Sequence, residues 1–173
     1  PVINPDSNQP AAPSFPFNHA GAVDASGSRR TQLAQWLTAP ENPYFAKSIV
    51  NRYWSYFFGR GIIDPVDDIR ASNPASNPEL LEALTKDFVA NQHDLKRLIR
   101  TICNSAAYQR SLAANQWNED DTINFSHALP RRLSAEQLYD SIIQAAGAPR
   151  ALPGVPAGFR AAELPDPQVE VAF

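Results

Sequence analysis

Residues 42–70 read NPYFAKSIVNRYWSYFFGRGIIDPVDDIR, and this stretch decides the fold. Asn42 and Pro43 predict a helix start, because an asparagine side chain accepts from an unpaired backbone N–H and a proline at the first helical position loses no hydrogen bond. Apolar side chains then recur every four residues, which is the spacing of one helix face. That face consists of Phe45, Ile49, Tyr53 and Phe57, with Val50, Trp54 and Phe58 beside it. The pattern predicts a central helix over 43–58 that is the most buried element of the fold.

Glycines and polar residues define the rest of this helix. Gly59 and Gly61 can adopt positive φ angles, which is typical of residues that end a helix. Asn51, Arg52 and Ser55 are expected on or near the side opposite the aromatic residues, so a solvated face is the first interpretation. The alternative is a buried Arg52 that organises the acidic loop after the helix.

That loop and its flanks bring three carboxylates close to three guanidinium groups. The six residues are Arg52, Arg60, Asp64, Asp67, Asp68 and Arg70. The first interpretation is a structural polar cluster of ion pairs and turn hydrogen bonds, because arginine and carboxylate form strong paired contacts. A metal site at Asp64, Asp67 and Asp68 is the second, since calcium binds several oxygens, although the spacing differs from the helix–loop–helix calcium motif. Acid/base catalysis by the same carboxylates is the third.

Four further helices are predicted from caps and apolar periodicity. Their expected first caps are Ser28, then Ser76 (with Glu79) or Asn77 (with Pro78), then Asp94 and Ser134. Their expected ends are Thr38, about Ala90, the vicinity of Tyr108, and Gly147. Helices of this length with short connections predict an all-α fold, a compact cluster of about five helices.

Three segments are expected along the chain. Residues 1–27 are proline-rich and predict an extended arm or linker, which Phe15 and Phe17 could anchor; 28–147 form the helical domain. Residues 148–173 predict an irregular tail that continues beyond this chain, with a short strand around Val169, Val171 and Phe173. The chain has no methionine, even at position 1, so we expect it to be part of a longer protein.

The connection before the last helix, residues 111–130, is polar and irregular. Trp117 and Phe125 are its only large candidate anchors. Glu119, Asp120 and Asp121 are expected to be solvated. The stretch carries no motif that assigns a chemistry to it.

Composition excludes several classes of function. The 173 residues have a net charge of −3, and no lysine or arginine run exceeds two residues, which argues against a nucleic-acid-binding surface. No apolar run approaches the ~20 residues that a membrane-spanning helix needs. Cys103 is the single cysteine, so the chain holds neither a thiolate zinc site nor a haem-attachment motif.

Three stretches together carry a resemblance to a known family. They are residues 33–84, from LAQWLTAPENPYF through the aspartate loop to ELLEAL, then HDLKRLIRTICNSAAYQRS and PRRLSAEQLYDSI. They resemble the planctomycete-type PSD domain, domain of unknown function 1553, over about 29–147. Members resemble large exported bacterial proteins that commonly carry a second domain of unknown function and often a cytochrome c-like module. Members usually continue past this chain's end.

The resemblance sets expectations about setting and partners. It implies a periplasmic or extracellular location, and partners among other domains of the parent protein or another envelope protein. It implies no cofactor in this chain, with haem in a linked module. The family brings no assigned activity and no catalytic residues to carry over.

Three functions follow from these observations, in order. The first is a structural or interaction module of a large exported protein, associated with a cytochrome c-type module. The second is an enzyme domain, hydrolytic or redox-linked, that uses the aspartate cluster. The third is an extracellular polysaccharide-binding module, for which the three tryptophans and five tyrosines would supply the aromatic surface.

Overall fold

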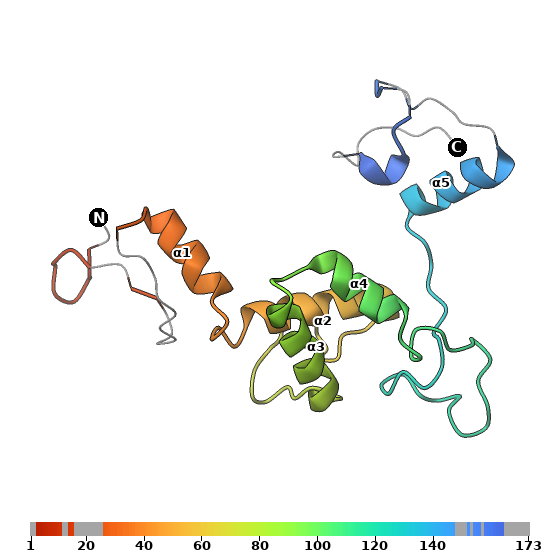
Figure 1. The fold of residues 1–173 in the computed structure, drawn as a ribbon, viewed down its shortest axis with the longest axis horizontal. Helices are drawn as coiled ribbons and strands as arrows, with labels where there is room; N and C mark the ends of the chain where they lie inside the picture. Colours follow the sequence, from red (N-terminus) through yellow and green to blue (C-terminus); the bar gives the residue numbers. More distant parts are fainter. Residues whose placement is uncertain are drawn as a thin grey trace. The chain divides into compact units, whose positions relative to one another are not determined.

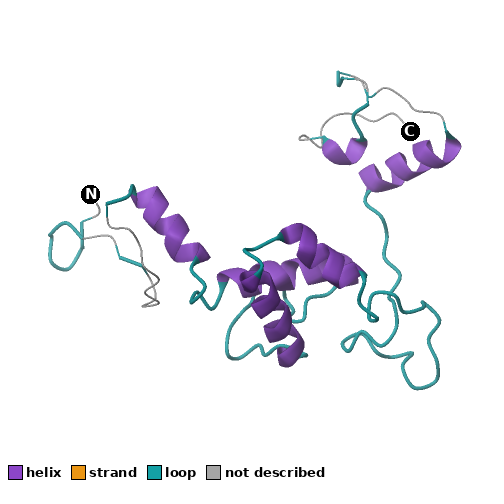
Figure 2. Cartoon of the chain, viewed as in Figure 1, coloured by secondary structure: helices purple, strands orange, loops and turns teal. Residues whose placement is uncertain are grey.

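The computed structural model describes residues 3–11, 14–15, 26–147, 152, 154–156 and 158–164. Helices are the only regular elements of this described part, apart from one isolated bridge between Ile3 and Pro10, which confirms the all-α fold class (Figures 1 and 2). The elements are α1 (Arg29–Thr38), α2 (Phe45–Phe58), α3 (Pro78–Ala90), α4 (Leu95–Cys103), α5 (Ala135–Ala146) and a 3₁₀ turn, η1 (Ala161–Glu163).

Helix starts follow the predicted capping chemistry. Backbone N–H groups in the first turns donate hydrogen bonds to the side chains of Ser28, Asn77, Asp94 and Ser134. Of the two alternatives before α3, the Asn77 cap with proline at the first position is correct. At the other end of the central helix, Gly59 has φ 80° and closes α2, as predicted.

The start of α2 joins it to α1. Asn42 Oδ1 accepts from the N–H groups of Tyr44 and Phe45, at 2.9 and 3.1 Å. Its Nδ2 donates to the Trp36 carbonyl at 3.3 Å, and Asn42 is buried. Asn42 thus accepts from N–H groups at the start of α2 as expected, but the N-cap position belongs to Tyr44, and the helix begins at Phe45, two residues after Pro43.

Helix α4 is shorter than predicted and ends at Cys103. Beyond it, the Ser105 hydroxyl donates to the Ile102 carbonyl and accepts from the N–H of Tyr108. A serine that bonds to nearby backbone offers the chain a turn in place of further helix. The residues up to Tyr108 consequently form turns.

The main core lies where α3 and α4 pack against α2. Its buried members are Ala46, Val50, Trp54, Ile62, Ile63, Leu81, Leu84, Phe88, Leu98 and Ile102. The prediction that α2 is central is thus supported, but the predicted buried stripe is wrong by one position. Phe45, Ile49, Tyr53 and Phe57 are half-buried and pack at the margin of the core.

The shift has a packing explanation. Ala46 and Val50 are small enough for α3 to approach α2, whereas a row of rings on that face would keep the two helices apart. Trp54 is the one ring of the buried stripe, and Phe58 at the core margin stacks on it at 4.1 Å and meets Phe125 at 5.1 Å. Phe125 is thus an anchor as expected, whereas Trp117 is 86% exposed and is not.

Contacts divide the chain into two units, 1–129 and 130–173. In the second unit, α5 packs with η1, and Tyr139, Leu152 and Ala161 form a small core. The boundary at Leu129 lies inside the segment 28–147 that the sequence suggests as one helical domain. Val169, Val171 and Phe173, the expected strand, lie outside the described residues.

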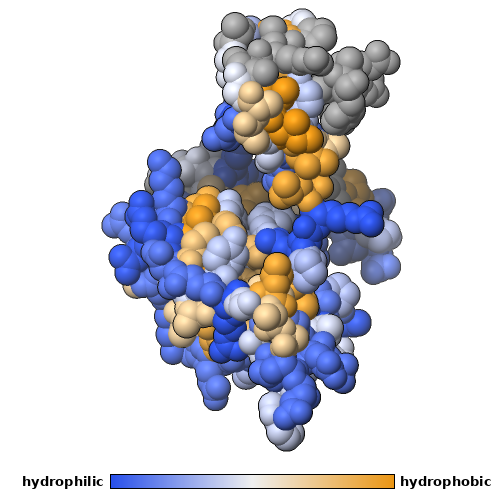
Figure 3. Space-filling model, turned by 90° about the vertical axis from the view of Figure 1, so that its right-hand side faces the viewer, coloured by the Kyte–Doolittle hydropathy of each residue, from blue (hydrophilic) through white to orange (hydrophobic). Residues whose placement is uncertain are grey.

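In the first unit, part of the N-terminal arm contacts α1. The Phe15 ring stacks on Trp36 with centroids 5.1 Å apart and an interplanar angle of 6°. Phe17, the other expected anchor, lies outside the described residues. On the face drawn in Figure 3, apolar residues are spread among polar ones in separate patches. None of the helices in the described part has the length and apolarity to cross a bilayer.

Candidate functional site

The loop between α2 and α3 is built around one buried amide. Asn51 is fully buried, and its Oδ1 accepts from the N–H of Ile63 at 2.9 Å. Its Nδ2 donates to the carbonyls of Ile63 at 2.9 Å and Val66 at 3.1 Å. The expectation that Asn51 lies on a solvated face is therefore wrong, because the loop folds back over this side of α2.

Gly61 makes that fold-back possible. A Cβ at this position would lie 2.2 Å from the Ile63 carbonyl oxygen and 3.0 Å from each terminal atom of the Asn51 amide. No side chain fits there. Of the two glycines, only Gly59 has the expected positive φ. Gly61 is required because the loop backbone passes close to it, and not because of its own backbone angle.

The far end of the loop is fastened by two further residues. Ser76 donates to the Ile62 carbonyl from both its N–H and its hydroxyl, at 2.8 and 3.0 Å. Asn73 Nδ2 donates to the carbonyls of Asp64 and Asp68, at 3.3 and 3.0 Å. Neutral amides and hydroxyls thus hold the backbone of this loop to α2 and to itself.

The six charged residues of the predicted cluster form three pairs. Arg52 pairs with Asp67, Arg60 Nη2 lies 3.9 Å from Asp64, and Arg70 Nε lies 2.8 Å from Asp68. The Asp67 side chain is 71% exposed and that of Arg70 68%. The alternative of a buried Arg52 is not what the structure has, since 42% of that side chain is exposed. In the described residues, no group of three or more carboxylate, histidine or cysteine side chains is arranged to hold a metal ion.

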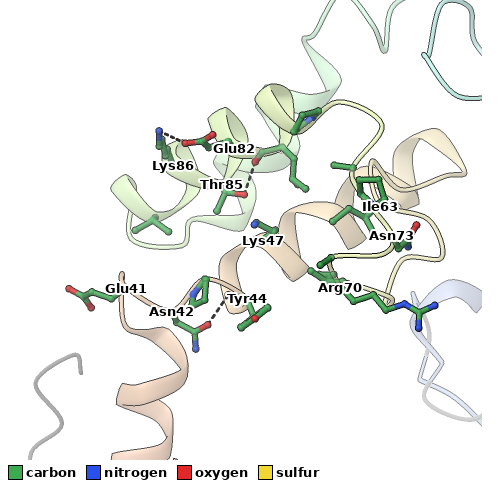
Figure 4. Close-up of a pocket in the computed structure, with 18 of the residues that line it drawn as sticks. Glu41, Asn42, Tyr44, Lys47, Ile63, Arg70, Asn73, Glu82, Thr85 and Lys86 are labelled. Atoms are coloured by element: carbon green, nitrogen blue, oxygen red, sulfur yellow. Dashed lines mark hydrogen bonds and ion pairs between the residues drawn. The ribbon is translucent and has the colours of Figure 1, made fainter. Parts of the chain in front are cut away.

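A groove of about 860 Å³ lies against this loop, bounded by α2, α3 and the turn before α2 (Figure 4). We call it the α2–α3 groove. Its apolar lining includes Pro43, Ile63, Ile69, Pro78, Leu81 and Val89. Ile63 is the residue held by Asn51, so the buried amide fixes one wall of the groove.

Charged side chains stand in and around the α2–α3 groove. Lys47 reaches from α2 toward α3 in Figure 4. On α3, Lys86 Nζ lies 2.6 Å from Glu82, and the hydrogen bond and charge of Lys86, with a smaller contribution from the charge of Lys47, hold the pKa of Glu82 below its ordinary value. Within the described part of the chain, the side chain of Lys47 forms neither an ion pair nor a hydrogen bond. Glu41 lies at the rim and is directed away from Lys47.

A separate polar site closes the irregular connection after α4. The Asp121 carboxylate accepts from the N–H groups of Ile123, Asn124 and Ser126, at 3.0, 2.8 and 3.1 Å. Hydrogen bonds from Ser126 and then Asn124 hold the pKa of Asp121 well below its ordinary value of 3.8. Beyond the expected solvation, the Asp121 carboxylate organises the turn around it.

Sequence reasoning missed Asn51, Gly61 and Lys47. A signal for the first pair exists: an asparagine in the middle of an apolar helix, followed ten residues later by a second glycine beyond the one that ends the helix. Lys47 has a weaker signal, as the single charged residue of the first two turns of an otherwise apolar helix. Neither pattern assigns a role without the contacts made by the loop.

Comparison with known proteins identifies a family but no characterised relative. The model of the family PSD1, described as protein of unknown function (DUF1553), matches residues 29–165. The match confirms the resemblance and extends it past Gly147 through η1. No curated protein and no solved structure matches this chain.

Proposed function

The chain belongs to the PSD1 family of proteins of unknown function (DUF1553), and we propose that it is an interaction module of a large exported bacterial protein. In this role it binds another polypeptide. The binding surface is the α2–α3 groove. Its partners are other domains of the same parent protein or another envelope protein.

One observation carries this proposal. The loop that walls the groove is fixed by Asn51, while its three aspartates are paired with arginines at the surface. A preformed apolar recess with a few charged groups is the usual form of a binding site. The enzyme alternative would need a carboxylate that faces a recess and is poised for proton transfer. The aspartates of this loop are paired with arginines, and Glu82 in the groove is paired with Lys86, which holds its pKa below the ordinary value.

The setting of the module is the second part of the proposal. The sequence resemblance supports export to the periplasm or the cell surface and a cytochrome c-type module in the same parent protein. Haem would then belong to that linked module. A fusion of the parent protein's own N-terminal region to a phosphatase that is active only outside the cytoplasm tests export: active fusions are expected, and inactive fusions would contradict it.

The binding role is tested on the full-length parent protein by amine-reactive cross-linking and mass spectrometry. The chain has three lysines; Lys47 and Lys86 line the groove, and Lys96 on α4 does not. We expect Lys47 and Lys86 to cross-link to residues outside this chain, and Lys96 to serve as the matched control. Cross-links to other polypeptide that involve Lys96 and spare both groove lysines would refute the groove as the binding surface.

A further inference from the structure

The α2–α3 groove holds one cation that has no ion-pair partner inside the described structure. Lys47 is half-buried. The two other basic residues that line the groove, Arg70 and Lys86, are exposed. Lys86 is paired with Glu82 and Arg70 with Asp68. The carboxylate of Glu82 feels the charge of Lys47 but is already paired with Lys86, so the partly buried ammonium of Lys47 favours a ligand that supplies a further negative charge.

The walls around Lys47 define the rest of the ligand. Pro43, Pro78, Ile63, Ile69 and Leu81 present apolar surface, and prolines offer no backbone N–H. Polar groups that also line the groove, such as Asn73 and Thr85, bond to carbonyls of the chain itself, and about 860 Å³ is far more space than a hydrated inorganic anion would fill. The groove therefore suits a ligand with apolar groups on both sides of a single anionic group.

We propose that the α2–α3 groove binds an extended peptide segment in which one aspartate or glutamate, flanked by aliphatic residues, pairs with Lys47. This inference deepens the proposed interaction function and rests on it. An extended chain places successive side chains on alternate sides, so its acidic residue can face Lys47 while its neighbours contact the walls. Because Figure 4 shows lining residues on both sides of Lys47, the acidic group is a side chain within the segment and not a terminal carboxylate.

Peptide selection tests the proposal and does not require the partner to be identified first. Random peptides displayed on phage are selected on the 173-residue chain, and in parallel on Lys47→Gln. We expect the wild-type selection to enrich peptides with one Asp or Glu between aliphatic residues, and the variant selection to lose them. Enrichment of basic or uncharged peptides, or the same acidic peptides from both selections, would overturn the assignment.

Synthetic peptides then measure the pairing. A selected peptide, labelled and amidated at its C-terminus, is titrated by fluorescence anisotropy against four proteins: wild type, Lys47→Gln, Lys47→Arg and Lys96→Gln. Loss of a charged pair predicts about tenfold weaker binding for Lys47→Gln, with Lys47→Arg within about threefold and Lys96→Gln unchanged. Circular dichroism melting confirms that each variant is folded.

Two peptide variants separate the source of the charge. Replacing the acidic residue by its amide is expected to weaken binding to wild type by the same factor, and to have no further effect on Lys47→Gln. The peptide that carries the amide in place of its acidic residue is then made with a free C-terminal carboxylate, which is expected not to restore binding. Restored binding would show that the groove binds a C-terminal carboxylate. If the groove lysines cross-link to partners but selected peptides bind independently of Lys47, the interaction function stands and the carboxylate pairing fails.

Discussion

The side chain of Asn51 and the backbone of Ile63 exchange two hydrogen bonds, each 2.9 Å long, with donor and acceptor reversed between them. The amide thus pairs with a loop residue as one strand pairs with another, but from inside a helix. Both partners are buried, so water cannot replace either bond. This relationship attaches the loop to α2 and shapes the groove beside it.

Substitution of Asn51 is therefore expected to be severe. Asn51→Ala strands the N–H and the carbonyl of Ile63 in a buried site, and each unsatisfied group costs about 1–3 kcal/mol. We expect a loss of about 3–5 kcal/mol in the free energy of unfolding, measured by urea denaturation. Asn73→Ala is the control, because Asn73 also donates to loop carbonyls but is only partly buried. Equal losses from the two variants would contradict the central role of Asn51.

Gly61→Ala is expected to disturb the same contact from the other side. The added methyl group would overlap the Ile63 carbonyl oxygen, which is backbone and cannot rotate away. Overpacking of this kind costs about 1–3 kcal/mol or more. Gly147→Ala is the comparison: it has a positive φ of 60° but open space around it, so only backbone strain of about 1 kcal/mol is expected. Thermal melting of both variants measures the difference.

Truncations along α2 distinguish the observed core from the predicted stripe. Trp54 is 2% exposed, so Trp54→Ala is expected to cost about 3–5 kcal/mol. Phe57 is only half-buried, and Phe57→Ala should cost clearly less. Tyr56 is 59% exposed, and its replacement by alanine is expected to stay within about 0.5 kcal/mol. A larger loss of stability from Phe57→Ala than from Trp54→Ala would mean that the predicted stripe, and not the observed one, faces the core.

The aspartate loop is expected to tolerate loss of a single carboxylate. Asp67 and Arg52 are both well exposed, and surface ion pairs contribute about 0–1 kcal/mol. Asp67→Asn should lower stability by no more than that, and by less still in 1 M salt, where the Debye length is about 3 Å. Denaturation at low and high salt measures both effects.

Chelation separates ion pairing from a metal site in the same loop. The arginine partners are protein groups, so EDTA is expected to leave the melting temperature unchanged in calorimetry. A large drop that calcium restores would mean that Asp64, Asp67 and Asp68 bind a cation. That result would revive the enzyme hypothesis for this loop.

Asp121 is expected to make stability depend on pH in the acid range. Its pKa is lower in the folded chain than its ordinary value of 3.8, so the unfolded chain binds the proton more readily. The stabilisation is present above pH 3.8 and is lost as the pH falls below that value. Asp121→Ala should cost about 1–2 kcal/mol at pH 7, and the difference from wild type should shrink toward about pH 3.

Asp120→Ala provides the control for that titration. Asp120 is the exposed neighbour of Asp121, and no hydrogen bond to its carboxylate is present in the described part. Its replacement should leave the pH profile of denaturation unchanged. If Asp120→Ala reduced the pH dependence of stability as much as Asp121→Ala does, the dependence would come from net charge and not from the hydrogen bonds of the turn.

Local chemistry made part of this fold predictable. Ser28, Asp94 and Ser134 cap their helices through contacts within three residues, which a sequence displays directly. The buried face of α2 was less accessible to prediction, because periodicity leaves two adjacent apolar stripes on that helix. The choice between them depends on which helices pack against α2.

The candidate site was harder to predict than the helices. Asn51 bonds to residues 12 and 15 positions away, and those bonds exist only after the loop folds back. The charges of Asp64, Asp67 and Asp68 suggested chemistry, whereas the neutral side chains of Asn51, Asn73 and Ser76 hold the loop. The position of Lys47 in the groove depends on how α3 and the loop pack against α2, and no local sequence pattern shows it.

The close approach at Gly61 also restricts how this protein can vary over evolutionary time. Any side chain at position 61 collides with the Asn51 amide and with the backbone that the amide binds. Replacing Asn51 first removes the reason for the tight approach, but it also frees the loop. The two positions therefore behave as one inherited character, and a lineage that changes one is expected to change the other and to reshape the groove.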